Sequence, residues 1–176
     1  MKMGIRRALM RMGCAAALAV ALAGCAHAPA PSVAWQQPLP GLYTSGQPAA
    51  SDWQAFKALG VRTVIDLRAP GERTDRDEAT EVQAAGLRYV QIPVKGEAGL
   101  TDENVRRLHQ ALAPSHAGVL VHCASGNRAG ALLALEQAQQ DGLPAAQALA
   151  LGKAAGLTHL EPAVRKALGL APVEGQ

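Results

Sequence analysis

The stretch Val119-Leu120-Val121-His122-Cys123-Ala124-Ser125-Gly126-Asn127-Arg128 joins a short apolar run to a cysteine, a glycine-containing turn and an arginine. The run 119–122 predicts a buried strand that carries Cys123 to the edge of a sheet. Gly126 permits a tight turn that directs backbone N–H groups inward, and the helix expected from Arg128 onward points its positive end at the same place. The stretch therefore predicts an anion-binding loop around a nucleophile, with a thiol that is expected to ionise.

Predicted strands and helices alternate along the chain. Strands are expected at residues 42–44, 62–67, 87–94 and 118–122, and helices at 52–59, 77–85, 101–112 and 128–140, with two more helices starting near residues 144 and 162. Such alternation predicts an α/β fold with a mostly parallel central sheet, helices on both faces and active groups at the carboxyl ends of the strands. Strand 42–44 is expected at the sheet edge, because a Ser-Gly-Gln-Pro turn ends it. Ser51 is expected to cap the helix at 52–59.

The first 24 residues predict an export signal. A basic start precedes an Ala/Leu/Val run at residues 13–24 that is too short to span a bilayer; the basic residues are Lys2, Arg6, Arg7 and Arg11. The run ends in Leu22-Ala23-Gly24-Cys25, which resembles the lipobox of bacterial lipoproteins. The resemblance implies cleavage before Cys25, lipidation of Cys25, and an anchor in a bacterial membrane that faces the periplasm or the cell exterior. The alternative is an ordinary secreted protein with an unmodified Cys25.

Residues 25–38 are expected to form the lipid-anchored cysteine and an extended, unpaired Ala/Pro tether. Residues 39–176 are expected to form one domain, large enough to bury its own core. The signal holds four of the 17 Lys and Arg residues and none of the 14 Asp and Glu residues, so its removal changes the formal net charge from +3 to −1. With no basic stripe and few aromatic residues, the chain is not expected to bind nucleic acid.

Cys123 is expected to be the one free thiol of the processed protein. Cys14 leaves with the signal and Cys25 carries lipid, so no intramolecular disulfide can form. A lone thiol in an exported protein, placed beside Gly126 and Arg128, favours a reactive role over that of a small packed hydrophobe.

Four segments stand in a fixed order between about residues 39 and 140: Leu-Tyr-Thr-Ser-Gly-Gln-Pro, Val-Ile-Asp-Leu-Arg with Glu72 nearby, Tyr-Val-Gln-Ile-Pro-Val, and Val-His-Cys-Ala-Ser-Gly-Asn-Arg. This order shows a resemblance to the dual-specificity-phosphatase-like domain of the bacterial beta-lactamase-hydrolase-like proteins. It implies a cysteine-phosphatase fold and hydrolysis of phosphomonoesters of the protein tyrosine or dual-specificity type. In that chemistry a Cys123 thiolate attacks phosphorus, and His122 orders the loop by hydrogen bonding. The phosphate oxygens are held by Arg128 and by the backbone N–H groups of Ala124, Ser125, Gly126, Asn127 and Arg128.

Two positions depart from the phosphatase pattern. Ala129 stands where a Ser or Thr hydroxyl usually helps the thiolate leave, and the position of the usual general acid falls near Gly96. Glu97 and Asp102 are the candidate replacements for that acid, although an acid after a helix cap is also ordinary helix chemistry. Asp66, Arg68, Glu72 and Arg73 are candidates for the mouth of a cleft or for surface ion pairs.

The loop from Cys123 to Arg128 has one residue fewer than the loop of tyrosine and dual-specificity phosphatases, and its length resembles that of rhodaneses. Sulfur transfer through a Cys123 persulfide, with a sulfur-donor substrate, is therefore an alternative, and a non-catalytic anion-binding module is another. His109, His116 and His159 show no metal-ligand spacing, and neither a metal nor a cofactor is expected.

Overall fold

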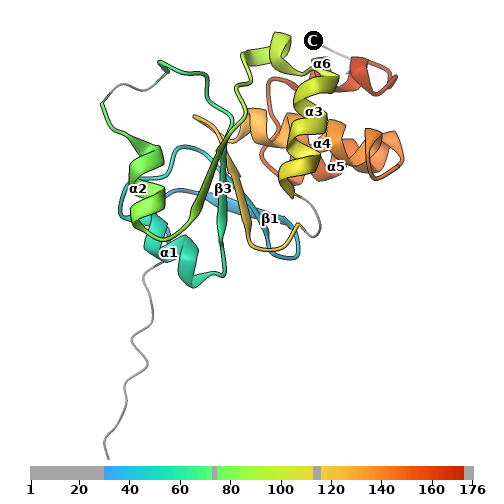
Figure 1. Ribbon diagram of the computed structural model, residues 1–176. Helices are drawn as coiled ribbons and strands as arrows, with labels where there is room; N and C mark the ends of the chain where they lie inside the picture. The colour runs from blue at the N-terminus through green and yellow to red at the C-terminus, as the bar shows by residue number, and fades with distance from the viewer. Residues whose placement is uncertain (1–29, 73–74, 113–115, 173–176) are drawn as a thin grey trace, which may run out of the picture.

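The computed structural model describes residues 30–72, 75–112 and 116–172 (Figure 1). The strands are β1 (Trp35–Leu39), β2 (Leu42–Ser45), β3 (Thr63–Asp66), β4 (Arg88–Gln91) and β5 (Val119–His122). The helices are α1 (Asp52–Ala58), α2 (Glu78–Ala84), α3 (Asp102–Leu112), α4 (Asn127–Gln139), α5 (Ala145–Ala154) and α6 (Glu161–Ala167), with a short 3₁₀ turn, η1 (Gly96–Gly99). The signal, Cys25, most of the expected tether and Arg73 lie outside the described residues.

The sheet has the order β1-β2-β5-β3-β4 and is parallel except for β1, which pairs antiparallel with β2. The register places Ser45 and Asp66 beside His122, so three strands end together at one edge. Cys123 follows directly at this edge. The predicted α/β fold with a mostly parallel sheet is confirmed.

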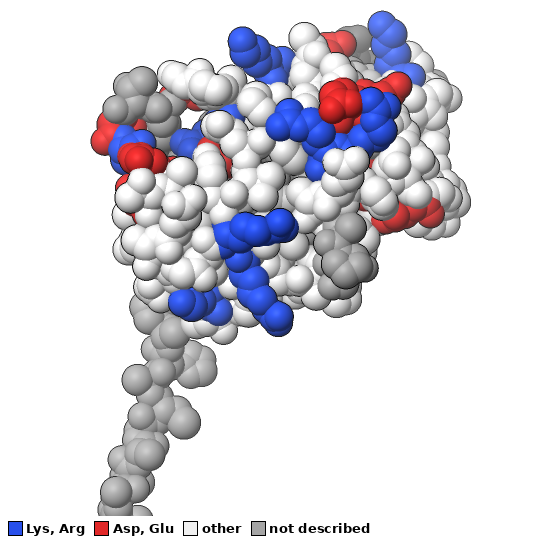
Figure 2. All heavy atoms as spheres, in the orientation of Figure 1, with Lys and Arg blue, Asp and Glu red and all other residues white. Residues whose placement is uncertain are grey.

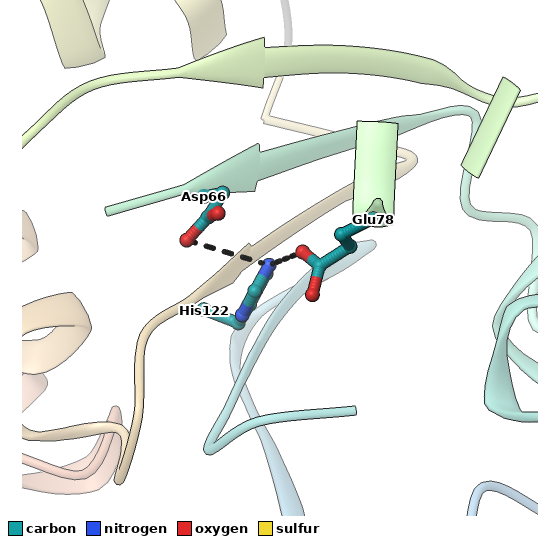
Figure 3. A group of neighbouring side chains, drawn as sticks. All are labelled: Asp66, Glu78 and His122. Carbon is teal, nitrogen blue, oxygen red and sulfur yellow. Dashed lines mark ion pairs between the residues drawn. The ribbon is translucent and has the colours of Figure 1, made fainter. Parts of the chain in front are cut away.

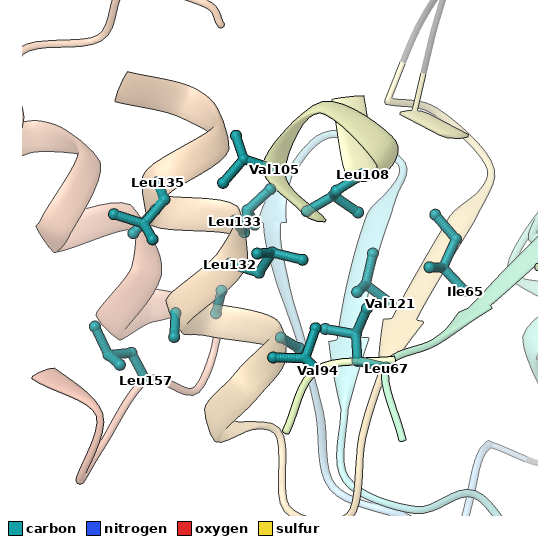
Figure 4. Packing of buried hydrophobic residues seen from close by; sticks show 14 of the residues in the cluster. Ile65, Leu67, Val94, Val105, Leu108, Val121, Leu132, Leu133, Leu135 and Leu157 are labelled. Carbon is teal, nitrogen blue, oxygen red and sulfur yellow. The ribbon is translucent and has the colours of Figure 1, made fainter. Parts of the chain in front are cut away.

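Each face of the sheet has its own apolar core. Trp53, Phe56 and Val82 bury against one face from α1 and α2. Side chains from α3 to α6 cover the other face. Figure 4 labels ten residues of this core: Ile65, Leu67, Val94, Val105, Leu108, Val121, Leu132, Leu133, Leu135 and Leu157. Burial on both faces explains why β3 and β5 have continuous apolar sequences. Among the helices in the described part of the chain, none combines the length and apolarity that a membrane crossing requires.

The fold begins earlier than the sequence suggests. Residues 35–38, assigned to the tether, belong to β1, and β2 lies inside the sheet between β1 and β5. Trp35 stacks edge-on against Tyr43 with 5.5 Å between the ring centroids, and this contact holds β1 in place. A turn between Leu39 and Leu42 joins β1 to β2 as an antiparallel hairpin. β1 is thus an edge strand that its Gln-Gln-Pro sequence does not predict.

Ser51 makes no capping hydrogen bond at the start of α1. The Asp52 carboxylate accepts instead from the backbone N–H of Ala49 at 2.9 Å and from that of Ser32 at 2.7 Å. Thus Asp52 provides an acceptor for a backbone N–H group in the turn before α1, and it holds Ser32, which precedes β1, against the start of this helix.

Candidate active site

The loop after β5 wraps its own cysteine. The Cys123 side chain is fully buried, and the Gly126 N–H donates to its Sγ at 3.1 Å. Gly126 has φ +89°, a left-handed conformation that an L side chain rarely adopts, and it is the residue before α4. The Gln47 N–H donates to the Ala124 carbonyl at 3.2 Å, so the loop is also held from β2. A backbone N–H group therefore points at Cys123, and α4 begins directly after the residue that supplies it.

Arg128 is fixed in front of this loop by a carboxylate. Its two terminal nitrogens each donate to one oxygen of Glu72 at 2.7 Å, and Nη1 also donates to the Val94 carbonyl at 3.0 Å. The hydrogen bonds to Glu72 raise the pKa of Arg128, whereas burial lowers it. The interaction with Cys123 raises this pKa as well. Conversely, the Arg128 guanidinium lowers the pKa of the Glu72 carboxyl. Glu72 is thus a positioning partner of the loop arginine.

A pocket of about 370 Å³ opens beside the loop. Its lining residues are Glu72, Gly96, Ser125, Asn127, Arg128, His159 and Leu160. Glu97 and Asp102 are both exposed and are not among them, since Glu97 projects from η1 and Asp102 lies in the first turn of α3. The structure thus brings Ser125, Asn127 and Arg128 together with Glu72, and it leaves the two candidate acids as untested predictions.

Asn127 does more than its predicted backbone role. Its side-chain oxygen accepts hydrogen bonds from the Thr158 N–H at 2.8 Å and the Leu160 N–H at 3.3 Å. These bonds hold the turn between α5 and α6 against the start of α4, which brings His159 to the pocket. Because Thr158 follows Asn127 by 31 positions, no local pattern in the sequence indicates this contact.

His122 points away from the cysteine, because neighbouring residues of a strand face opposite sides of the sheet. Its Nε2 lies 2.9 Å from Glu78 Oε1 and 3.9 Å from Asp66 Oδ1, in a buried cluster drawn in Figure 3. The cluster also contains a guanidinium, since Arg68 Nη2 lies 2.7 Å from Asp66 and 2.8 Å from Glu78. The ring of His122 makes no hydrogen bond to the loop in the described part of the chain. The predicted hydrogen bonding of His122 to the loop is therefore not found among the described residues, because the ring lies on the opposite face of the sheet at Glu78 and Asp66.

The same cluster shows how the charges behind the loop are balanced. Burial opposes ionisation of Asp66, but hydrogen bonds from Arg68 and Tyr89 and the charge of His122 hold the pKa of this carboxyl below its ordinary value. Burial and the negative charge of Asp66 raise the pKa of Tyr89, so its hydroxyl remains a donor to Asp66 at 2.8 Å. Ligand atoms of Asp66, Glu78 and His122 lie within 4.8 Å of one another. The Arg68 guanidinium already supplies positive charge to both carboxylates, so these residues fit a charge-balanced cluster better than a metal site.

Two other histidines lie close to acidic residues, His109 in α3 beside α4, and His116 before β5 beside the residues that follow α4. His109 Nδ1 lies 2.9 Å from the buried Glu136, and His116 Nε2 lies 3.5 Å from Asp141. The amide of Gln137 donates to both carboxylates, at 2.9 Å and 2.6 Å. Hydrogen bonds among these side chains account for the group, which the sequence spacing did not indicate.

The fold and the cysteine loop define the class of protein. Residues 39–140 match the family model of the phosphatase-like domain of the beta-lactamase hydrolase-like proteins, and the chain belongs to this family. It is 34% identical over 119 residues to the beta-lactamase hydrolase-like protein of Xylella fastidiosa (strain Temecula1). That match covers 65% of this chain and 27% of the relative, so the chain spans about a quarter of the length of this curated protein.

Solved structures show the same fold. A DUF442 candidate phosphatase from Shewanella putrefaciens CN-32 is 34% identical, with a TM-score of 0.57 over 68% of this chain and 77% of that one. TpbA of P. aeruginosa, solved in complex with phosphotyrosine, is 21% identical, with a TM-score of 0.54 over 82% of this chain and 96% of that one. The second likeness concerns the fold alone. Together with the family match, these structures place the chain among proteins with the fold of cysteine-dependent phosphatases.

Proposed function

We propose that this protein hydrolyses phosphomonoesters, of the protein tyrosine or dual-specificity type, through a phosphocysteine at Cys123. One observation carries the proposal. A buried thiol, the Gly126 N–H that donates to it, and an arginine held by Glu72 converge on one loop at the carboxyl end of the sheet. This arrangement supplies a nucleophile together with fixed donors for an oxyanion.

In the first step, the Cys123 thiolate attacks phosphorus and the bond to the leaving oxygen breaks. Charge rises on the equatorial phosphate oxygens, where the planar Arg128 fork and the loop N–H groups can donate hydrogen bonds. In the second step, water attacks the phosphocysteine and the thiolate leaves. Ala129 is fully buried in α4 and brings no hydroxyl to this second step. We therefore expect breakdown of the intermediate to limit turnover with reactive substrates.

The substrate is proposed to be a phosphorylated side chain or a small aryl phosphate. The family match and the phosphotyrosine bound by TpbA support this class. We also propose that the protein is anchored through a lipid on Cys25 and faces the periplasm or the cell exterior, where its substrate would lie. Loss of incorporation of labelled fatty acid in Cys25→Ser would support the anchor, and equal incorporation would exclude it.

Sulfur transfer is a second candidate because only four residues separate Cys123 from Arg128. A persulfide on Cys123 would need neither a general acid nor a hydroxyl at position 129. The Cys123 thiolate would attack the outer sulfur of thiosulfate, whose S–S bond breaks to release sulfite, so the Cys123 peptide would gain one sulfur atom, a change that mass spectrometry detects.

Parallel assays on an aryl phosphate and on thiosulfate with cyanide separate the candidates. The proposal predicts release of the phenol and inorganic phosphate by the purified protein and no release by Cys123→Ser, which keeps the size of the side chain. Phenol release that survives Cys123→Ser would contradict the proposal. Turnover of thiosulfate alone would favour sulfur transfer. Phosphate binding without turnover of either substrate would favour a binding module.

A further inference from the structure

His159 lies on the rim of the proposed active site although it is far from Cys123 in the sequence. It lines the pocket together with Ser125 and Arg128, and its side chain is exposed to solvent. It belongs to the turn whose Thr158 and Leu160 N–H groups donate to the side chain of Asn127. Asn127 is buried and opens α4, so a residue of the cysteine loop also positions the histidine.

Two glycines allow this turn to approach the loop closely. A Cβ atom at Gly130 would lie 2.5 Å from the Gly152 carbonyl oxygen, and it would also meet the backbone of Leu157. Gly156 has φ +101°, and a Cβ atom there would lie 3.4 Å from the Gly126 carbonyl oxygen. The segment that leads to His159 therefore packs backbone against backbone on the start of α4, which leaves its position little freedom.

Hydrogen bonds assign the two nitrogens of the imidazole. Thr158 Oγ1 lies 3.1 Å from Asn127 Oδ1 and 3.2 Å from His159 Nδ1. The amide oxygen can only accept, so the threonine hydroxyl donates its hydrogen to Asn127. The hydroxyl oxygen must then accept from the N–H at Nδ1. This chain keeps a proton on Nδ1 and leaves Nε2 as the nitrogen that gains and loses a proton.

The other charged groups that line the pocket, among the described residues, are Glu72 and Arg128, which are hydrogen-bonded to each other. Both oxygens of Glu72 accept from Arg128, and a guanidinium does not give up its proton at physiological pH. Glu97 and Asp102 do not line the pocket. An imidazole, by contrast, exchanges protons near neutral pH and is the side chain most often used for general acid–base catalysis.

We propose that His159 is the general acid and base of the reaction, a role that rests on the phosphatase function proposed above. In the first step, Cys123 Sγ bonds to phosphorus, the bond to the leaving oxygen breaks, and that oxygen takes its electron pair and the proton from Nε2. In the second step, water bonds to phosphorus and gives a proton to Nε2, while the S–P bond breaks and its electron pair returns to sulfur. Inorganic phosphate leaves, and His159 is again protonated.

The test uses two substrates that differ in the basicity of the leaving oxygen. Dinitrophenyl phosphate releases a stable phenolate that needs no proton, whereas phenyl phosphate releases a basic oxygen that does. In His159→Ala of the purified protein, we expect kcat/KM for phenyl phosphate to fall about 10²-fold or more and that for dinitrophenyl phosphate to stay near the wild-type value. The fall of kcat/KM on the alkaline side of neutral pH should also disappear for phenyl phosphate. His116→Ala, a histidine outside the pocket, serves as the matched control and should change neither substrate.

Equal losses on the two substrates would overturn the proposal, because they would indicate a binding or structural role. A failure of the phosphatase function itself has a different signature, in which the wild-type protein turns over neither substrate or Cys123→Ser retains activity. Thr158 supplies a second test as a positioning residue. Thr158→Val removes the acceptor for Nδ1 and should shift the alkaline limb of the pH profile, while Thr158→Ser keeps the hydroxyl and should restore it. An unchanged profile in Thr158→Val would contradict the assigned hydrogen-bond chain.

Discussion

Replacing Asp66 by Asn should destabilise the protein more than the loss of any single exposed ion pair. The Asp66 carboxylate is 1% exposed and accepts hydrogen bonds from the backbone N–H, Nε and Nη2 of Arg68 and from the Tyr89 hydroxyl, at 2.7 to 2.9 Å. Asn removes the negative charge and turns an N–H₂ group toward at least one of these donors. Arg68 would remain buried with a weaker counter-charge.

The expected cost follows from this geometry. Removing one partner of a buried ion pair costs about 3 to 5 kcal/mol, because the other charge stays buried. Glu78 still lies 2.8 Å from Arg68 in the variant, so we expect the lower end, about 3 kcal/mol. Urea unfolding followed by circular dichroism would measure this loss as a lower midpoint at an unchanged slope.

Two variants serve as controls for Asp66→Asn. Tyr89→Phe removes one donor and leaves the ion pair, so it should cost about 1.5 kcal/mol. Glu103→Gln breaks an ion pair with Arg106 in which both side chains are more than half exposed, and it should cost less than about 1 kcal/mol. If Asp66→Asn cost no more than Glu103→Gln, the argument that the buried cluster supports the strand ends would be refuted.

Three further predictions concern the orientation of Arg128, the packing at Gly130 and the stability of the protein at low pH. Glu72→Gln should lower kcat/KM for aryl phosphates about 10- to 100-fold, as expected when charged hydrogen bonds that orient Arg128 are lost, and an unchanged value in steady-state kinetics would contradict this role. Gly130→Ala should lower the free energy of unfolding by about 1 to 3 kcal/mol, since its methyl group meets backbone. Gly142→Ala, with no atom within 4 Å but φ +71°, measures the cost of backbone strain without overpacking. The folded-state pKa values of Asp66 and Glu72 lie below their ordinary values of 3.8 and 4.5, so their stabilisation is complete above those values and is lost as the pH falls through the folded-state values. Unfolding that requires less urea at low pH would agree, and a midpoint that stays constant or rises there would contradict it.

The local sequence predicted what depends on neighbours in the chain. The apolar run before Cys123, the glycine at position 126 and the helix from residue 127 follow from strand, turn and helix chemistry, and the structure has all three. Gly60 and Gly86, with φ +93° and φ +76°, stand where the helices before them were expected to stop. β1 was missed because its polar, proline-containing sequence lacks a strand pattern and depends on pairing with β2.

The composition of the pocket could not be predicted in the same way. Glu72 precedes Arg128 by 56 residues and His159 follows it by 31, and the packing of three loops brings them together. The sequence named Glu72 only as a candidate for the mouth of a cleft or for a surface ion pair, without its partner, and gave His159 no role. Long-range contacts of this kind depend on tertiary packing, which leaves no periodic signal in a single sequence.

Detection of a phosphorylated Cys123 tests the central claim most directly. The protein would be mixed with dinitrophenyl phosphate, quenched within the first turnover and digested for mass spectrometry. The proposed mechanism predicts one PO₃ unit on the Cys123 peptide of the wild-type protein and none at this position in Cys123→Ala. Turnover of the substrate at a measurable rate with no phosphate on Cys123 at any quench time, or with activity intact in Cys123→Ala, would contradict it.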